Sequence, residues 1–331
     1  MNATRSRSGY TIAELLVVTS IFATLFGMIS VANTPSKRAQ IRRGAQSLAS
    51  ALTATQSRAL GRETGAALIL DTDATTGDYV ANVFHADSLP HIAGTATGVP
   101  PATASSLTAS GTITPTNADV ADLQNGYKIC FSENNALTQP ASGWLQFTPP
   151  ASATSNVATV SLRGTSGQTL ANTIWPKPVS PTFDILVARY PVKAQQALQF
   201  AKLAAIDLRY SGVGDDPTAP YGTLCDKGAI AIGFDRIGGV DAVMQQVLSA
   251  ASARTYQPLD PITPVYFFVA AREDILDPTV NTLASDEAMW VVVHPQTGRV
   301  HVSANVPQSG TGAVSLRDAR ANARAGIPLG K

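Results

Sequence analysis

One long apolar segment near the N-terminus constrains this chain more than any other feature of its sequence. Residues 10–33 read YTIAELLVVTSIFATLFGMISVAN and contain a single charged side chain, Glu14. As an α-helix, a segment of this length measures about 34 Å, enough to cross the hydrocarbon core of a bilayer. The sequence therefore predicts a transmembrane helix at 10–33, with a cleaved secretory signal peptide as the alternative.

A carboxylate such as that of Glu14 is unfavourable in an apolar segment, because placing it near the centre of a bilayer costs roughly 2.5 to 3.5 kcal/mol of insertion free energy. Glu14 is close to the start of the segment, so its side chain could reach a polar interface. A cation could also pair with it, yet no Lys or Arg occurs between Arg7 and Lys37. Cleavage between Gly9 and Tyr10 would create an α-amine nearby, and pairing with that amine would offset the desolvation of the carboxylate.

The residues around this position resemble the N-terminal processing and methylation motif of type IV pilins and type II secretion pseudopilins. A short basic leader, residues 1–9, ends in Gly9, and an aromatic residue follows at Tyr10. Glu14 is fifth after the expected cut and precedes an apolar run. Two departures are minor, because Tyr10 stands where Phe is usual and Ala13 where Ile or Leu is common.

By this resemblance, a prepilin peptidase removes the leader after Gly9 and N-methylates Tyr10, and Glu14 pairs with the Tyr10 amine of a neighbouring subunit during assembly. The resemblance implies a non-enzymatic pilin-like structural subunit of a type II secretion pseudopilus or a type IV pilus. Its implied partners are other pilin-like subunits, the prepilin peptidase and the platform proteins of the secretion or pilus machine. The implied location is the bacterial inner membrane, with a single span and the body in the periplasm or extracytoplasmic space.

A second helix is predicted over residues 34–62, as an amphipathic continuation of the first. Pro35 has no backbone N–H and restricts the residue before it, which favours a kink at this point. Apolar residues then recur at helical spacing up to a glycine stop at Gly61, namely Ile41, Ala45, Leu48, Leu52 and Ala59. This Ala-rich stripe favours a sheet as its partner. Residues 42–70 also resemble the helix-to-first-strand passage of minor pseudopilins of the GspH/FimT type.

Charge is unevenly distributed between these N-terminal residues and the rest of the chain. Residues 1–62 contain eight basic residues and one acid, a net charge of +7, whereas the remaining 16 basic and 22 acidic residues give −6. Such asymmetry indicates different surroundings for the two parts. The whole chain has a net charge of +1, so bulk charge argues against nucleic acid as a partner.

The remaining residues, 63–331, are predicted to form a body made mostly of strands. Apolar and β-branched runs indicate strands at 66–70, 79–84, 127–131, 182–189, 229–234, 265–270, 290–293 and 300–302. Helical spacing indicates helices at 194–206, 240–252 and 315–325. The expected fold class is α+β: a long N-terminal transmembrane helix, kinked near Pro35, that packs against a predominantly antiparallel sheet. Two uncharged tracts, 88–118 and 134–162, are interpreted as polar surface insertions in this body.

Residue patterns for catalysis or metal binding are sparse. The histidines are too scattered for a zinc site, and His294 and His301 are expected to form a cross-strand pair in a hairpin. The Asp71-Thr72-Asp73 run lacks the glycine and the final glutamate of a calcium loop and is interpreted as a solvated turn. No catalytic residue, metal or cofactor is predicted. The alternative function is a membrane-anchored envelope binding protein or hydrolase that uses residues 66–331.

Cys130 and Cys225 are the only cysteines. An even pair outside the cytoplasm could form a disulfide that closes a large loop, which the chain-entropy estimate values at about 4 to 5 kcal/mol. Two buried thiols explain the same count, because the sequence alone does not place the two Cα atoms within bonding range.

Overall fold

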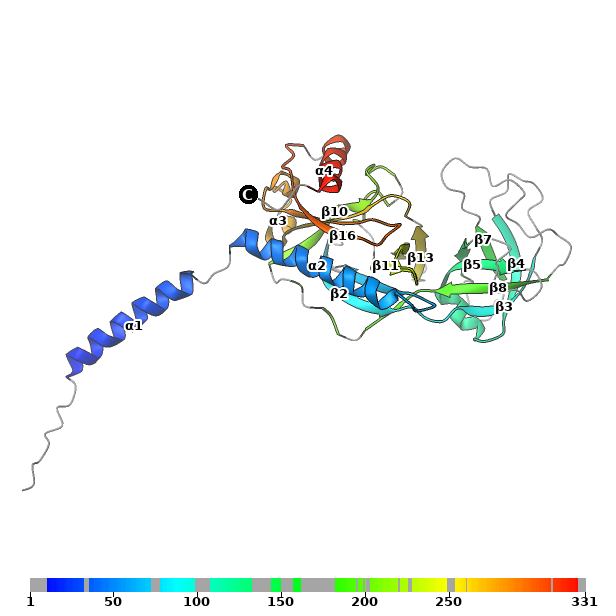
Figure 1. The fold of residues 1–331 in the computed structure, drawn as a ribbon, viewed down its shortest axis with the longest axis horizontal. Helices are drawn as coiled ribbons and strands as arrows, with labels where there is room; N and C mark the ends of the chain where they lie inside the picture. Colours follow the sequence, from blue (N-terminus) through cyan, green and yellow to red (C-terminus); the bar gives the residue numbers. More distant parts are fainter. Residues whose placement is uncertain are drawn as a thin grey trace, which may run out of the picture.

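The fold is that of a computed structural model of the chain. The structure describes residues 11–32, 36–72, 78–98, 108–132, 144–149, 157–161, 182–194, 196–198, 200, 203–219, 221–225, 228–248, 254–259, 261–310 and 312–326. Within this part, the chain forms a large antiparallel sheet with helices on both faces, a separate closed β-barrel and an N-terminal helix that extends away from the body (Figure 1).

The large sheet has ten strands, all of them antiparallel to their neighbours. Nine form a continuous path in the order β13 (Arg254–Leu259), β12 (Val240–Leu248), β11 (Ile230–Phe234), β1 (Ala66–Thr72), β2 (Tyr79–Asp87), β10 (Ala204–Val213), β14 (Val265–Ala271), β15 (Met289–Val293) and β16 (Val300–Ala304). The tenth, β9 (Val192–Lys193), pairs with the end of β2. The central strands are buried on both faces, as β14 and β15 show along their whole length.

The sheet curls around helix α2 (Lys37–Ala59). Four strands separate β11 from β15 in the sheet, yet the turns after these two strands meet, because the N–H of Val240 donates to the carbonyl of Pro295 at 2.7 Å. The amide of Gln56, near the end of α2, bridges the same two turns by donating to the carbonyls of Gly238 and Thr297. The apolar stripe of α2 is therefore enclosed, and its residues are buried as the sequence predicted: Ile41, Ala45, Leu48, Leu52 and Ala59.

Two helices cover the opposite face of the sheet. They are the short α3 (Arg272–Leu276) and the C-terminal α4 (Ala313–Ala325), and a 3₁₀ turn η2 (Thr282–Ala284) lies beside them. Leu316, Ala319 and Ala323 of α4 pack into an aromatic core with Trp290 and Phe268. Buried apolar surface on both sides supplies the main favourable term for folding of this sheet.

The closed barrel is inserted between β2 and β9. Its strand order is β3 (Ile92–Gly98), β4 (Thr108–Pro115), β7 (Val157–Ser161), β6 (Leu145–Thr148), β5 (Gly126–Ser132) and β8 (Thr182–Arg189), and a 3₁₀ helix η1 (Val120–Asn125) precedes β5. The barrel has a core of its own, built around Ile113, Ile129, Phe131, Phe147 and Val187. Its entry and exit segments are held together because Ala86 and Asp87 pair with Lys193 and Val192.

A third apolar cluster joins the barrel to the sheet. Tyr127, Ala188 and Tyr190 of the barrel region pack with Phe84 and Met244 of the sheet. Beside this cluster, the ammonium of the buried Lys128 donates to the carbonyl of Asp241 at 3.0 Å and approaches its carboxylate at 3.3 Å.

The structure corrects the expected fold class. The chain is mostly antiparallel sheet with few helices, in place of an α+β fold led by a long N-terminal helix. The first helix, α1 (Ile12–Ala32), starts after Tyr10, and Glu14, Thr19, Ser20 and Thr24 interrupt its apolar sequence. Within the part of the chain that the structure describes, no helix is long and apolar enough to cross a membrane. The predicted transmembrane segment at 10–33 and the single-pass inner-membrane location are therefore wrong.

Most of the predicted strands are confirmed, but two predicted helices are wrong. All eight predicted segments contain strands, and α4 matches the predicted helix at 315–325. The segment 240–252 contains strand β12, and β10 begins within 194–206. These strands are buried on both faces, so their apolar residues do not alternate, and single-sequence spacing confuses them with helices. The described parts of the uncharged tracts 88–118 and 134–162 contain four strands of the barrel, β3, β4, β6 and β7.

Candidate assembly surface

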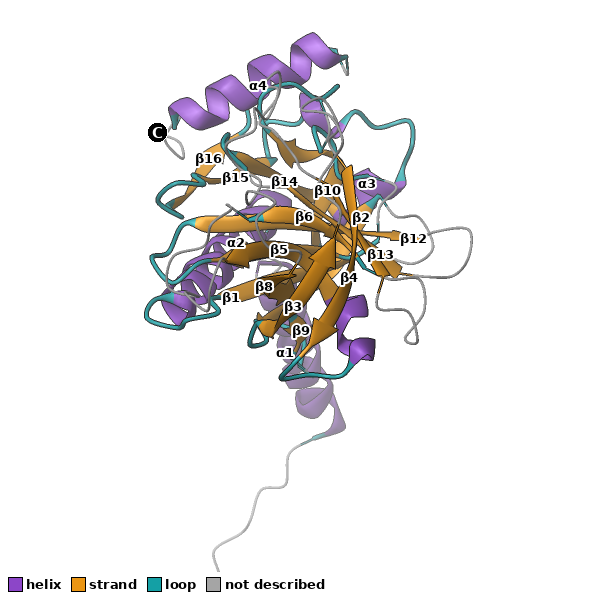
Figure 2. Cartoon of the chain, turned by 90° about the vertical axis from the view of Figure 1, so that its right-hand side faces the viewer, coloured by secondary structure: helices purple, strands orange, loops and turns teal. Residues whose placement is uncertain are grey.

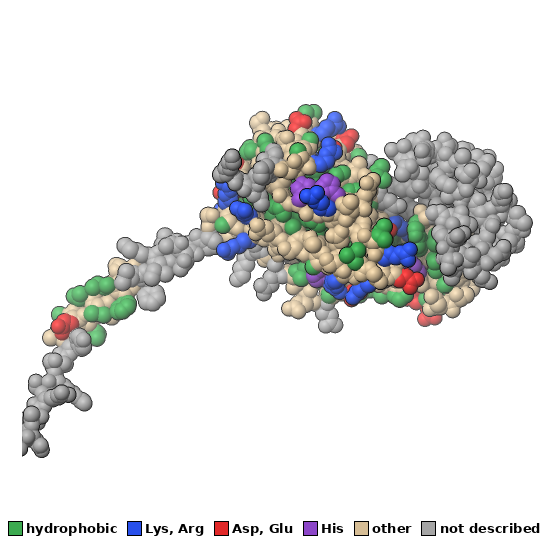
Figure 3. All heavy atoms as spheres, in the orientation of Figure 1, with side chains coloured by type: hydrophobic (Ala, Val, Ile, Leu, Met, Phe, Trp, Pro, Cys, Tyr) green, Lys and Arg blue, Asp and Glu red, His purple; other side chains and the backbone are tan. Residues whose placement is uncertain are grey.

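Helix α1 presents the largest run of exposed apolar side chains in the described residues. Ile12 is 85% exposed, and large apolar side chains remain uncovered on every side of the helix as far as Phe22: Leu15, Leu16, Val17, Val18 and Ile21. Figure 3 shows hydrophobic side chains along this helix, with an acidic group close to its start. A contiguous apolar surface of this kind marks a site that another molecule covers.

Glu14 occupies the third position of α1 and forms a capping box with Thr11. Its carboxylate accepts hydrogen bonds from the Thr11 N–H at 2.9 Å and from the Thr11 hydroxyl at 3.0 Å, and the Glu14 N–H donates to that hydroxyl at 3.3 Å. These bonds, led by the one from the Thr11 N–H, lower the pKa of Glu14. Glu14 therefore has a local role that the sequence analysis missed, although the Thr-x-x-Glu spacing signals it.

The other predicted processing residues, Gly9 and Tyr10, lie outside the described residues, as does the predicted kink at Pro35. Cys130 is buried in barrel strand β5, whereas Cys225 follows β10 at the side of the large sheet. The two cysteines are not joined by a disulfide, because they belong to different folding units. Burial raises the pKa of the Cys130 thiol to about 11, so this thiol stays protonated at neutral pH.

Helix α2 anchors the N-terminal region to the body. The Ser36 hydroxyl caps its start by accepting from the Ala39 N–H, and Lys37 pairs with Glu273 at 2.9 Å and Asp274 at 2.8 Å on α3. Hydrogen bonds to Asp274 and Glu273 raise the pKa of Lys37. These contacts fix the start of α2 against α3.

Three arginines on the exposed side of α2 have no acidic partner among the described residues: Arg38, Arg42 and Arg43. The helix itself contains no acid. The positive charge seen in the sequence is therefore concentrated at the end of the body from which α1 projects.

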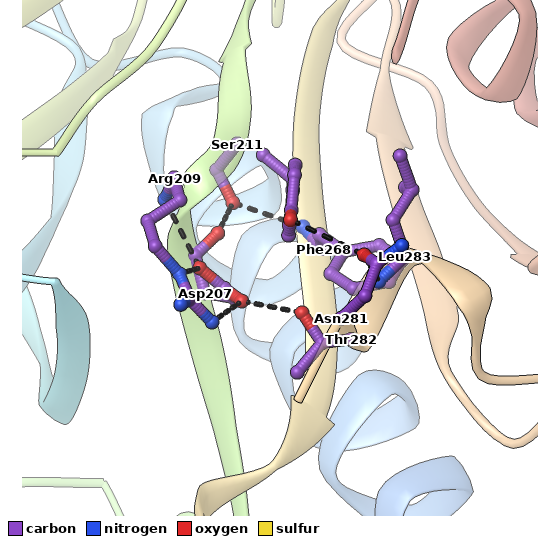
Figure 4. Close-up of polar contacts among 8 residues, drawn as sticks. Asp207, Arg209, Ser211, Phe268, Asn281, Thr282 and Leu283 are labelled. Atoms are coloured by element: carbon purple, nitrogen blue, oxygen red, sulfur yellow. Dashed lines mark hydrogen bonds and ion pairs between the residues drawn. The ribbon is translucent and has the colours of Figure 1, made fainter. Parts of the chain in front are cut away.

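A buried polar network on β10 is the strongest candidate for chemistry in the body. Asp207 is fully buried, and Figure 4 shows Arg209, Ser211 and Thr282 around it. The guanidinium of Arg209 donates to both carboxylate oxygens at 3.0 and 2.8 Å, and the Thr282 hydroxyl donates at 2.8 Å. The hydrogen bonds to Asp207 raise the pKa of Arg209.

The geometry of this network indicates a structural role, because it links β10 to β14. The Ser211 hydroxyl donates to the carbonyl of Asp207 at 2.6 Å and accepts from the Phe268 N–H at 2.9 Å, at the point where the pairing of β10 with β14 shifts register. No histidine or other base lies among its hydrogen-bond partners in the described residues, so Ser211 has no group to activate it as a nucleophile. The network satisfies the backbone at an irregular part of the sheet.

The four histidines lie in three places, none of which is a metal centre in the described part of the chain. His91 precedes β3, and its ring centroid is 5.1 Å from that of Trp144. Nδ1 of His85 is 2.9 Å from the Thr55 hydroxyl of α2. His294 and His301 stack across the β15–β16 hairpin, with ring centroids 5.3 Å apart, as the sequence predicted. Nε2 of His301 donates to the Ala323 carbonyl at 3.0 Å, so the hairpin is tied to the end of α4.

The described residues of the body line at least two surface cavities. One, of about 350 Å³, is at the junction of sheet and barrel, where Asp71 and Lys193 pair at 2.9 Å beside Tyr190 and Gln246. The other, of about 370 Å³, is beside the β15–β16 turn and is lined by Ile262, Pro264, His294, Pro295, Gln296, Thr297 and Arg299. Neither cavity is lined by two carboxylates. Converging carboxylates in a pocket would have supported the alternative function as a hydrolase.

Comparisons with known proteins identified no relative of this chain. No family model matches the chain, and neither a curated protein nor a solved structure is similar to it.

Proposed function

We propose that this chain is a non-enzymatic pilin-like structural subunit, processed by a prepilin peptidase between Gly9 and Tyr10 and assembled with other pilin-like subunits into a type II secretion pseudopilus or a type IV pilus. The observation that carries the proposal is α1, an apolar helix that projects from a folded body and whose described side chains, up to residue 24, are exposed. The prepilin-type residues Gly9, Tyr10 and Glu14 support it at the sequence level.

Assembly would bury the apolar side chains of α1 against the same helix of neighbouring subunits. Each Å² of apolar surface removed from water contributes about 25 cal/mol, so burial of these side chains favours association of the subunits. Inside such a bundle the Glu14 carboxylate would be desolvated, and the Tyr10 α-amine of a neighbour would offset that cost. The body, fixed to α2, would then face outwards.

Processing is tested by the intact mass of the protein from cells with and without an active prepilin peptidase. The expected product begins at N-methylated Tyr10 and appears only when the peptidase is active. A chain that still begins at Met1 in both cells, or one cut beyond residue 30, would exclude pilin-type processing.

The role of Glu14 is tested by two variants that separate its charge from its capping bonds. Glu14→Gln keeps an acceptor for the Thr11 N–H but removes the charge, whereas Thr11→Val removes the hydroxyl and keeps the charge. Subunit crosslinking in cells is expected to fail for Glu14→Gln and to persist for Thr11→Val. If crosslinking instead failed for Thr11→Val and persisted for Glu14→Gln, the role of Glu14 would be to cap the helix and its charge would not be needed for assembly.

A further inference from the structure

The large sheet has one open edge, at β16. Among the described strands, β16 pairs with β15 alone. Two hydrogen bonds fix which of its main-chain groups point toward β15: His294 N–H to the Arg299 carbonyl, and Asn305 N–H to the Ala288 carbonyl. Because bonded and non-bonded pairs alternate in an antiparallel ladder, the main-chain groups of Val300, Val302 and Ala304 point away from β15. In the described part of the chain, no group accepts a hydrogen bond from these three N–H groups.

The opposite edge of the sheet, β13, is protected. It lies beside barrel strand β5, and it contains Pro258, which has no N–H to donate. Proteins commonly guard their sheet edges with proline, charge or a covering element. Strand β16 has the sequence Val-His-Val-Ser-Ala and carries none of these guards.

The two helices beside β16 cover its faces and leave its edge open. Val300, Val302 and Ala304 pack toward α2 on one face, and His301 bonds to α4 on the other. Figure 2 shows β16 at the margin of the sheet, between α4 and α2. These three residues are nevertheless only half-buried, so the edge itself reaches solvent.

A cationic corner adjoins the start of the open strand. Arg299 is exposed and has no acidic partner among the described residues, and the stacked His294 and His301 lie next to it. Figure 3 shows histidine and basic side chains gathered on the face of the body where β16 runs. The cavity of about 370 Å³ opens at this corner, where Ile262, Pro264 and Pro295 supply apolar walls.

We propose that the β16 edge binds an extended segment of a partner protein as an additional antiparallel strand. The outward N–H and carbonyl groups of Val300, Val302 and Ala304 form the ladder. Near its C-terminal end the segment places a carboxylate side chain on Arg299 and an apolar side chain in the neighbouring cavity. Charge complementarity with Arg299 and the outward N–H groups of β16 select this occupant. The proposal does not depend on the pilin-like function.

The test is a titration of the ¹⁵N-labelled protein with the peptide acetyl-Thr-Val-Thr-Val-Thr-Glu-Leu-amide, followed by amide chemical shifts and hydrogen exchange. Slowed exchange is expected at Val300, Val302 and Ala304. Val302→Pro removes one outward N–H and is expected to weaken binding about tenfold. Arg299→Glu is expected to weaken binding of this peptide and to strengthen binding of the version with Lys in place of Glu.

Arg43→Glu is the matched control, because Arg43 is also exposed and also has no acidic partner among the described residues, but lies on α2. It makes the same charge change away from the edge and is expected to leave both peptides unaffected. The proposal is overturned if the peptide does not protect the β16 amides, or if Arg299→Glu and Arg43→Glu act alike. Pairing of two copies of the chain through β16, detected by sedimentation, would also overturn it. Because Arg299 is a surface residue, its variant decides the matter even if Val302→Pro does not fold.

Discussion

At the scale of single residues, Arg320 connects parts of the body that are far apart in sequence. It lies on α4, is fully buried, and donates hydrogen bonds to the carbonyls of Tyr210, Gly214 and Gly222 at 2.7 to 2.8 Å. Burial lowers the pKa of Arg320 to about 10, which still leaves it charged at neutral pH. One guanidinium thus donates hydrogen bonds both to an irregularly paired part of β10 and to the chain that follows this strand.

Arg320→Met is expected to destabilise the protein by about 3–5 kcal/mol, because it leaves three carbonyls without their buried donor. Arg317→Met is the control on the same helix. Its exposed guanidinium is 3.6 Å from Asp216, and its loss is expected to cost less than about 1 kcal/mol. Urea denaturation of both variants measures the difference. Equal losses would mean that the Arg320 bonds add nothing to stability.

Three histidines predict a pH dependence of stability. Burial is the largest cause that lowers the pKa of His85, His91 and His294, with further lowering of His294 by His301 and nearby arginines. In the unfolded chain these groups take up protons near pH 6.5, while the folded protein resists protonation until a lower pH. Stability is therefore complete above about pH 6.5 and falls as the pH decreases toward the lowered values.

Unfolding by urea at pH 7.5, 6.5 and 5.5 checks this direction. The urea concentration at the midpoint of unfolding is expected to decrease as the pH is lowered. His91→Gln replaces a ring whose centroid is 5.1 Å from that of Trp144, and it is expected to make the midpoint depend less on pH. A midpoint that rises on acidification, or a His91→Gln profile identical to that of the unchanged protein, would contradict the assignment.

At the scale of elements, the close contact of α2 with β10 depends on a glycine. A Cβ built at Gly44 would lie 2.7 Å from the Cβ of Ala204, far inside van der Waals contact. The helix can approach the sheet this closely only where both positions have small side chains.

Gly44→Ala is expected to destabilise the protein by about 1–3 kcal/mol, despite the gain of about 1 kcal/mol in helix propensity. Adding Ala204→Gly removes the opposing methyl group and is expected to recover part of the loss. Thermal unfolding of the single and double variants provides the measurement. A stabilising Gly44→Ala would show that helix and sheet separate freely at this contact.

The same elements show what the sequence could predict and why the rest could not follow. The α2 stripe and the 294–299 turn are local patterns, since helical spacing and Gly298 at φ 62° depend on neighbouring residues alone. The sequence predicts a helix where strand β12 lies. This strand is buried on both faces by residues distant in the sequence, so its apolar residues do not show the alternation of a strand. The Glu14 cap was visible in Thr-x-x-Glu, whereas the open β16 edge depends on a strand order that no local signal contains.

At the scale of the whole molecule, the barrel is a complete folding unit whose sequence is inserted between two strands of the large sheet, β2 and β9. All its strands come from residues 92–189, and Ala86 pairs with Lys193 across its entry and exit. The sequence predicts β5 and β8 as strands but does not reveal the barrel, because β3 and β4 are rich in Thr, Ala and Gly and have few of the bulky residues by which strands are recognised. A barrel closes its own hydrogen bonds, so such strands can persist with a small core.

Docking of the barrel on the sheet depends on Asp241. Its carboxylate and carbonyl hold the buried Lys128, and its other carboxylate oxygen accepts from the Tyr127 hydroxyl at 3.3 Å. Asp241→Ala removes the carboxylate beside the buried Lys128 charge, which disfavours the docked position more than it disfavours either unit alone. Amide exchange of β5 and β8 is therefore expected to speed up about tenfold, while that of β14 and β15 stays unchanged.

Asp122→Asn is the matched control for this experiment, because Asp122 is a barrel acid whose pair with Arg189, at 4.0 Å, is partly exposed. It is expected to leave exchange in both units unaltered, since such pairs contribute little to stability. If Asp241→Ala accelerated β14 and β15 as much as β5 and β8, the barrel and the sheet would open as one cooperative unit. The Lys128–Asp241 contact would then belong to a single shared core, and the barrel could not be treated as a separate unit with a junction of its own.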